Sequence, residues 1–346
     1  MIFIPFVLSP NVFNFEGLSQ TDVEDRLFQL KMLDKIISIK GIMLIDSQGF
    51  IKNEIKGFVE TIENDNIKKA VITLISKLFN SSIFEVDINE LDFQIMQYCK
   101  YFFSLISTNP KAIAIYGIPD CSELKNCQKC YKENTMDSKE LYSITEIKTD
   151  KFLKFFDVTS IASINDYDIE KLKKDILENI SKYSKELFIF DNQLIPDIEK
   201  QNRKDEKFKI ARNYEKNLEY WLEYFNTINQ KLKISIFLSI KINQNQILDD
   251  IINSFVKFKQ DLRRKYPYIN LELRTIEENK RTESIVITPH QRYFIFDKIA
   301  FSCDRGIDLI NFSRTKELRD FNISLLSQKD RTDVFNYLCN NSKIIN

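Results

Sequence analysis

The sequence predicts an α/β protein built from two domains. Short apolar runs of strand length alternate along the chain with longer segments whose apolar residues recur every three or four positions, which is typical of strands alternating with helices. The chain has 346 residues, of which 43% are hydrophobic and 29% charged, a balance that suits folded globular domains. We expect an N-terminal α/β or α+β domain over residues 1–180 and a C-terminal α/β domain over residues 181–346.

The elements of the first domain follow one another closely. Residues 2–8, 41–46 and 111–118 are apolar enough to be buried strands. Residues 23–37 have the spacing of an amphipathic helix, and residues 67–107 are mainly helical in pattern. Together these segments predict a sheet with helices packed against it.

Two acidic residues of the first domain stand where a metal site can begin. Asp46 ends the apolar run 41–46, and Glu54 lies in the segment that follows. Carboxylates at this position are similar to the first acids of PIN-like nucleases, a resemblance that implies metal ligation by both residues. A solvated strand end and an exposed helix residue explain the same two acids, and no complete acidic set can be assigned.

Cysteines cluster in a predicted loop at residues 119–131. Cys127 and Cys130 form a C-x-x-C pair, Cys121 precedes them, and Cys99 lies on the preceding predicted helix. Two thiolates in a tight turn can reach one zinc ion, and a structural zinc site needs four ligands. The four cysteines are therefore candidate ligands of a structural zinc, and reduced thiols in a surface loop are the alternative.

The second domain shows the clearer pattern. Strands are predicted at residues 187–190, 234–240 and 269–276, with helices at 214–232 and 247–262 between them. Helices of this length between strands predict a mostly parallel sheet with right-handed crossovers, in which ligands gather at the strand ends. The tail, residues 311–346, adds helical material.

Charge and hydropathy limit the classes of partner. Fifty basic residues balance fifty acidic ones, so a surface for nucleic acid or membrane must be a local patch. The segment 200–212 holds six lysines and arginines and could form such a patch, although Asp205 and Glu206 make a solvated helix start equally suitable.

The apolar start of the chain has no basic residue and contains Pro5, so we expect a strand there and not a signal peptide. No apolar run reaches the roughly 18 residues of a transmembrane helix. The expected location is the cytoplasm.

The stretch of residues 285–309 concentrates ionisable groups between strand-like runs. It contains His290, the only histidine of the chain, followed by Arg292 and Asp297 in the order H-x-R-x-x-x-x-D. After the next apolar run comes Asp304-Arg305-Gly306-Ile307-Asp308. A buried core does not need so many charged side chains, so the sequence predicts a functional site here.

These two motifs resemble those of the phospholipase D superfamily, with Arg292 in place of the usual lysine. The pattern is similar to that of a divergent branch, the C-terminal domain of microtubule-interacting-and-trafficking proteins and its prokaryotic relatives, in which H-D-R-Y is followed by an apolar strand and G-R-G-x-D. The resemblance covers about residues 185–315. Gln291 replaces the acid of the first motif, and Asp304 replaces the first glycine of the second.

The resemblance implies a site for a phosphate group. It implies catalytic positions at His290, Arg292 and Asp297, and phosphate contacts from Arg292, Arg305 and Asp308, because arginine can hold phosphate through two parallel hydrogen bonds. Enzymes of the superfamily use two histidines, one as nucleophile and one as acid, so a chain with one histidine could complete that scheme only as a homodimer.

Three hypotheses follow for the second domain. The first is a phosphate-recognising module for nucleic acid or another phosphodiester, and the resemblance implies a place in prokaryotic antiphage defence or mobile-element systems. The second is a dimeric phosphodiesterase or nuclease that uses His290. The third is an interaction or scaffold protein in which His290 is a hydrogen-bonded structural residue and Arg292 pairs with Asp297 or Asp308.

Overall fold

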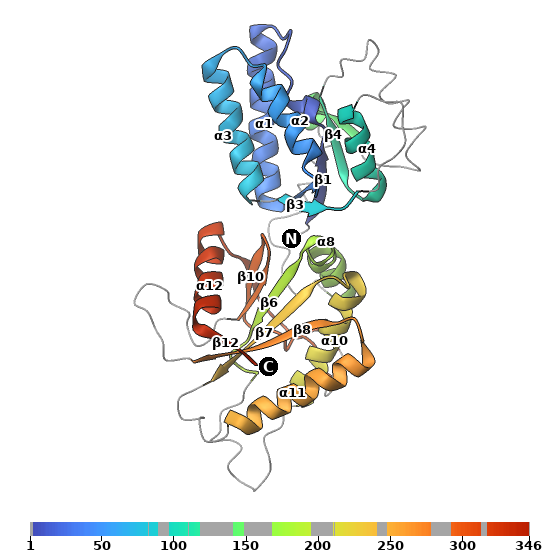
Figure 1. Cartoon of the computed structure of the whole chain (residues 1–346), viewed down its shortest axis with the longest axis vertical. Helices are drawn as coiled ribbons and strands as arrows, with labels where there is room; N and C mark the ends of the chain where they lie inside the picture. The colour runs from blue at the N-terminus through green and yellow to red at the C-terminus, as the bar shows by residue number, and fades with distance from the viewer. Residues whose placement is uncertain are drawn as a thin grey trace. The chain divides into compact units, whose positions relative to one another are not determined.

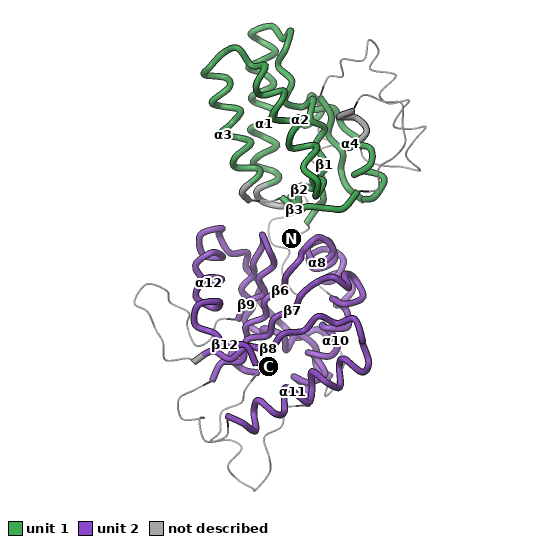
Figure 2. Tube along the Cα trace, in the orientation of Figure 1, with its two compact units in different colours: residues 1–162 green, residues 163–346 purple. Residues whose placement is uncertain are grey.

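Two separate β-sheets organise the chain in the computed structural model, one in residues 1–162 and one in residues 163–346 (Figures 1 and 2). The structure describes residues 3–81, 83–88, 97–109, 111–117, 141–148, 168–194, 210, 212–240, 248–277, 292–312 and 317–345. Both units are α/β, as the sequence predicted. The division falls before the helical segment at residues 169–183, so this segment belongs to the C-terminal unit.

The sheet of the N-terminal unit is parallel throughout, with strand order β3-β2-β1-β4-β5. Its strands are β1 (Ile4–Leu8), β2 (Gly41–Asp46), β3 (Ile83–Val86), β4 (Ile113–Tyr116) and β5 (Leu141–Ser143). Its helices are η1 (Pro10–Phe13), α1 (Gln20–Lys40), α2 (Phe50–Glu60), α3 (Asp65–Ser81), α4 (Gln97–Thr108) and η2 (Ile144–Lys148). A parallel sheet is covered on both faces, which is why β1, β2 and β4 are almost entirely buried.

The sheet of the C-terminal unit is mixed, with strand order β11-β10-β9-β6-β7-β8-β12. The strands are β6 (Glu186–Phe190), β7 (Lys233–Ile240), β8 (Asn270–Glu277), β9 (Tyr293–Phe296), β10 (Ala300–Cys303), β11 (Ile323–Leu325) and β12 (Ser342–Ile345). The helices are α7 (Ile169–Leu172), the π-helical turn η4 (Lys173–Leu177), α8 (Glu178–Tyr183), α10 (Arg212–Ile228), α11 (Leu248–Lys265) and α12 (Gln328–Asn341). Strands β6, β7 and β8 are parallel, while β9 runs antiparallel to β6 and forms a hairpin with β10.

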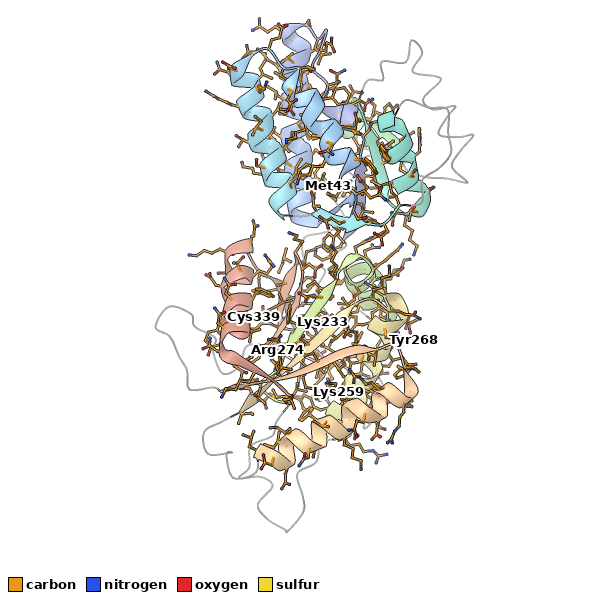
Figure 3. The ribbon with its side chains drawn as sticks, in the orientation of Figure 1. Met43, Lys233, Lys259, Tyr268, Arg274 and Cys339 are labelled. Carbon is orange, nitrogen blue, oxygen red and sulfur yellow. The ribbon has the colours of Figure 1, made fainter. Side chains whose placement is uncertain are left out.

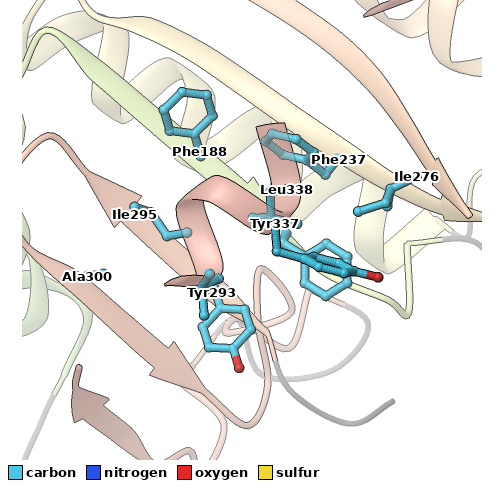
Figure 4. Close-up of a cluster of buried hydrophobic side chains, with 10 residues drawn as sticks. Phe188, Phe237, Ile276, Tyr293, Ile295, Ala300, Tyr337 and Leu338 are labelled. Atoms are coloured by element: carbon cyan, nitrogen blue, oxygen red, sulfur yellow. The ribbon is translucent and has the colours of Figure 1, made fainter. Parts of the chain in front are cut away.

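Helices cover both faces of this mixed sheet. On one face, Val334, Tyr337 and Leu338 of α12 pack against Phe188, Ile295 and their neighbours (Figure 4). Side chains alternate between the faces along a strand, so Phe296 points the other way, where its ring lies 6.3 Å from the ring of Phe225 on α10. The sheet is therefore a central layer, and the ends of its strands remain as the places where polar side chains can gather.

Some strands were not predicted. β3 is only four residues long and lies inside the region 67–107, for which the pattern predicted helix. β11 and β12 fall in the tail for which helical material was predicted, and of that tail α12 is the helix. β12 pairs antiparallel with β8 and forms one edge of the sheet. Residues 285–291 lie outside the described residues, and the run after His290 forms β9.

Candidate functional site

The carboxyl end of β6 carries a fully buried aspartate, Asp191. Its side chain is 0% exposed. One carboxylate oxygen accepts the main-chain N–H of Gln193 at 2.9 Å, and the other accepts that of Ile307 at 2.9 Å. The Nε atom of Arg292 lies 3.1 Å from Asp191 Oδ1, close enough for an ion pair although not aligned for a hydrogen bond. A buried charge is tolerated only when it is paired in this way.

Gly306 lets the loop after β10 close over this pair. Its φ of +58° is in the left-handed region, which side chains other than glycine seldom adopt. A Cβ atom built at Gly306 would lie 2.1 Å from Asp191 Oδ2 and 2.5 Å from Arg292 Cδ. The glycine of the second motif is therefore required by close packing against the first polar pair.

Asp308, at the end of the same loop, is held by α10. Its Oδ1 accepts hydrogen bonds from the side-chain amides of Asn213 and Asn217, and its Oδ2 lies 3.6 Å from a terminal nitrogen of Arg319. Asn217 also exchanges two hydrogen bonds with the main chain of Ile310, at 2.8 and 2.9 Å. These contacts fix the loop 304–310 to the helix and bring a second aspartate–arginine pair to the site.

Tyr214 of α10 lies within electrostatic reach of both pairs. Burial raises the pKa of its hydroxyl, and the charges of Asp191 and Asp308 raise it further against the opposing effect of Arg292 and Arg319. The hydroxyl therefore stays protonated and can donate a hydrogen bond at any physiological pH.

Burial also raises the pKa of both carboxyl groups. That of Asp191 is raised to about 6, because loss of hydration outweighs the stabilising effect of Arg292 and the two main-chain N–H groups. The pKa of Asp308 is raised for the same reason, with Arg319 and Asn213 opposing the shift. Two carboxylates that are costly to ionise stand beside two guanidinium groups that carry permanent charge.

The two arginines at this site use only part of their hydrogen-bonding capacity. Among the described residues, Arg292 meets Asp191 through Nε, and Arg319 meets Asp308 through one terminal nitrogen. Their side chains are 15% and 27% exposed. Arg305 is exposed, and its Nε donates to the main-chain oxygen of Asp320 at 3.1 Å. Within the described part of the chain, three arginines near one loop therefore have donor nitrogens for which no partner is seen.

Asp297 does not share this site with Arg292. The two residues flank the four-residue strand β9, and the five residue steps between them span about 17 Å. Asp297 instead accepts the main-chain N–H groups of Lys185 and Glu186 at 2.7 and 2.8 Å, at the start of β6. Its own carbonyl accepts a hydrogen bond from Arg331 of α12. The geometry gives Asp297 a role in joining β6, β9 and α12, and the partner of Arg292 is Asp191 instead of Asp297 or Asp308.

Other predicted positions lie outside the described residues. His290, Cys121, Cys127, Cys130 and most of the basic segment 200–212 belong to this group. Cys99 lies on α4, but its side chain is not described.

The two acids of the N-terminal unit lie on β2 and α2. Asp46 is 1% exposed, and its two oxygens accept the main-chain N–H groups of Phe50 and Ile51 at the start of α2. Glu54 lies on α2, half-buried. Among the described residues, no three histidine, cysteine or acidic side chains are close enough together to hold a metal ion. Asp46 therefore caps the start of α2. An aspartate between a strand and a helix is typical of such a cap.

The strand order of the N-terminal unit places a switch point between β1 and β4, where doubly wound sheets bind ligands. The side-chain oxygen of Asn11, a residue only 2% exposed, accepts the N–H of Gly117 at 2.9 Å there. A Cβ atom at Gly117 would lie 2.2 Å from the main-chain oxygen of Asn11. In the described residues, the chain itself therefore fills this position.

A second charged cluster lies on strands β7 and β8 (Figure 3). The Glu272 carboxylate lies 2.5 Å from Arg274 and 3.4 Å from Lys233, and accepts a hydrogen bond from Ser235. Arg274 also donates to Ser342 of the neighbouring strand β12. The charges of these described residues are paired with one another across the sheet, and the hydrogen bond from Arg274 to Ser342 adds to the pairing of β12 with β8.

Sequence reasoning selected Arg292, Arg305 and Asp308 but missed the residues that hold them. Asp191 directly follows a buried strand, which was the available signal. Asn213 and Asn217 stand one helical turn apart on the face of α10 that the apolar pattern marks as buried, and buried amides at that spacing indicate a bound polar group. For Arg319, the sequence pattern showed only that other basic residues lie nearby, which does not predict a role in the site.

A search of the described residues for membrane-spanning helices and comparisons with known proteins gave no matches. Within the described ranges, no helix has the length and apolar composition required to cross a bilayer. No protein-family model, curated protein or solved structure matches this chain.

Proposed function

We propose that the C-terminal unit recognises phosphate groups of a phosphodiester ligand, most directly a nucleic-acid backbone, through Arg292, Arg305 and Arg319. The observation that supports this most is the unused donor capacity of Arg292 and Arg319 beside the loop 304–308. A guanidinium group bound on one side only can still form two parallel hydrogen bonds to phosphate oxygens. The motif resemblance over residues 185–315 supports the same ligand and a context in prokaryotic defence or mobile-element systems.

The arginines can contact a diester individually. Asp191 and Asp308 offset the charges of Arg292 and Arg319, and Asp304 lies beside Arg305 in the loop 304–308, so these six groups carry no net charge. Each phosphodiester carries one negative charge, and several arginines along one surface can contact successive phosphates. Phosphate contacts of this kind position a nucleic acid without reading its sequence.

Binding can be measured by the fluorescence anisotropy of a labelled single-stranded oligonucleotide over a range of salt concentrations. The test variant is Arg305→Gln with Arg319→Gln, because both side chains reach solvent. Its matched control is Arg263→Gln with Arg264→Gln on α11, which makes the same charge change on exposed residues of the same unit. We expect the test variant to weaken binding by about tenfold or more and to reduce the slope of log affinity against log salt by about 1.4, since each phosphate contact on a single strand contributes about 0.7.

Equal loss in the test variant and the control would reduce binding to general charge attraction and contradict the proposal. Arg292→Lys adds a second test, since lysine keeps the charge but loses the planar donor pair. It should weaken binding although net charge is unchanged.

The alternative hypothesis, a dimeric phosphodiesterase, predicts a different result. Cleavage of the oligonucleotide in the presence of a metal chelator, abolished in His290→Ala, would establish turnover by the single histidine of each chain. Under the binding proposal, His290→Ala leaves most of the affinity intact and no such cleavage is seen.

A further inference from the structure

A groove of about 450 Å³ lies between α2 and α3 in the N-terminal unit. Its floor is apolar and consists of Ile55 and Val59 from α2 with Ile72, Ile75 and Phe79 from α3. The two helices run antiparallel, since Lys52 near the start of α2 lies 5.9 Å from the ring of Phe79 near the end of α3. From residue 52 to residue 60 the groove is about 12 Å long.

Part of this apolar floor faces solvent. Ile72 is 45% exposed, one of the few large apolar side chains with such exposure among the described residues. Ile75 and Phe79 are half-buried, whereas Ile55 and Val59 are buried at the bottom. Exposed apolar surface that is concave and continuous indicates a bound partner more than an isolated exposed side chain does.

The charges on the rim differ between the two ends of the groove. Lys52 and Lys56 stand one turn apart on α2, and Lys56 has no ion-pair partner among the described residues. Like charges at this spacing repel each other and are stabilised by a bound anion. At the other end, Lys68 donates to the main-chain oxygen of Glu60, and the lining there includes one basic and one acidic side chain, so it has no excess charge.

We propose that this groove binds a single-chain anionic amphiphile, an acyl chain with a terminal carboxylate or similar anion. The chain lies on the apolar floor, and the anionic group lies between Lys52 and Lys56. The volume falls within the range of about 300–1,000 Å³ that is usual for small-molecule sites lined by apolar side chains with few polar groups. The position of the excess charge at one end matches a ligand with one charged end. An acidic amphipathic helix would instead need cations along both flanks, and Glu60 opposes it.

The test uses the full-length protein and dodecanoate below its micelle-forming concentration, with binding followed by calorimetry. Dodecyltrimethylammonium and dodecanol provide probes with the same chain and a cationic or neutral end. We expect saturable one-to-one binding of dodecanoate, at least about tenfold tighter than that of the cationic probe. Equal affinity for the anionic and cationic probes, or no saturable binding, would overturn the proposal.

Variants separate the two parts of the site. Lys52→Gln with Lys56→Gln should weaken dodecanoate binding at least about fivefold and leave dodecanol unchanged, whereas Ile72→Asn should weaken both. Lys31→Gln with Lys69→Gln removes two exposed lysines of the same unit outside the groove and should change neither affinity. Circular dichroism confirms that each variant is folded. Equal loss in the lysine control, or binding of an acidic amphipathic peptide without dodecanoate binding, would overturn the proposal.

Discussion

Asp191 makes the stability of the C-terminal unit depend on pH in an unusual direction. Its folded pKa of about 6 is above the ordinary value for aspartate of 3.8, because burial penalises the charged form. The folded state therefore binds the proton more tightly than the unfolded state between about pH 4 and pH 6. The contribution of this group to stability is fully present below about pH 4 and is lost as the pH rises through about 6.

We expect the variant Asp191→Asn to lack this dependence. Measured by urea unfolding, the stability of the unaltered protein relative to the variant should fall by on the order of 2 kcal/mol between pH 4 and pH 6. The ion pair with Arg292 forms only when Asp191 is ionised, and its effect is already contained in the folded pKa, so its loss in the variant adds no separate dependence on pH. A constant difference between the two proteins over this range would show that Asp191 keeps an ordinary pKa.

Gly306 offers a test of the packing around the same pair. Replacement by alanine imposes a left-handed backbone on a residue with a side chain and drives its Cβ atom into Asp191 and Arg292. We expect Gly306→Ala to lower the free energy of unfolding by about 3 kcal/mol or more, since backbone strain and displaced core atoms add.

Gly17 is the matched control for this substitution. Its φ is +71°, but nothing lies within 4 Å of a Cβ atom there. Gly17→Ala therefore carries only the backbone cost of about 1–2 kcal/mol. Similar losses in both alanine variants, measured by chemical unfolding, would mean that the loop 304–308 adjusts without disturbing the buried pair.

At the scale of elements, β9 separates two functions that one sequence motif joins. Arg292 precedes the strand and Asp297 follows it, so the strand directs the arginine to the carboxyl end of β6 and the aspartate to its start. Asp297→Ala removes the acceptors of two main-chain N–H groups. We expect it to lower the free energy of unfolding by about 2–4 kcal/mol and to leave oligonucleotide affinity within about twofold at temperatures where the protein is folded.

The comparison with Arg292→Lys checks this separation, because that variant should lose affinity with less effect on stability. A loss of affinity in Asp297→Ala equal to that of the arginine variants would place both residues in one site. Anisotropy and urea unfolding on the same preparations distinguish the two outcomes.

How much of the fold could be predicted depended on the length and burial of each element. β2 and β7 are continuous apolar runs bounded by helices, and both were predicted with nearly correct ends. β3, β11 and β12 are three or four residues long and lie at or near sheet edges, where their partly exposed side chains give no clear alternation. Short strands of this kind are determined by their pairing partners, which a local pattern does not contain.

The site was predicted in part for a similar reason. Arg292, Gly306 and Asp308 lie in one stretch, so their pattern was visible. Their partners come from distant segments: Asp191 and Ile307 are 116 positions apart, and Asn217 and Asp308 are 91 apart. The sequence therefore indicated the arginine that meets a charged group but not the buried aspartate that it meets.

At the scale of the whole molecule, each unit contains its own sheet, covering helices and core. Every described residue of the proposed phosphate site comes from residues 163–346, and the apolar cluster beneath α12 also lies entirely within this unit. A segment with its own core and complete layers meets the requirements for independent folding. The proposed phosphate site and the proposed amphiphile groove belong to different units, so the two proposals can be separated physically.

We therefore expect residues 163–346, produced alone, to unfold in a single cooperative transition and to bind the oligonucleotide with the salt dependence of the full-length chain. The isolated unit should not bind dodecanoate, because the groove between α2 and α3 is absent from it.

Unfolding followed by circular dichroism and tryptophan fluorescence gives a direct check, since Trp221 is buried in this unit and is the only tryptophan of the chain. Coincident transitions indicate two-state folding. A segment that folds but loses oligonucleotide binding would show that residues 1–162 contribute to the ligand surface, whereas a segment without a cooperative transition would show that the C-terminal core is stable only within the full chain.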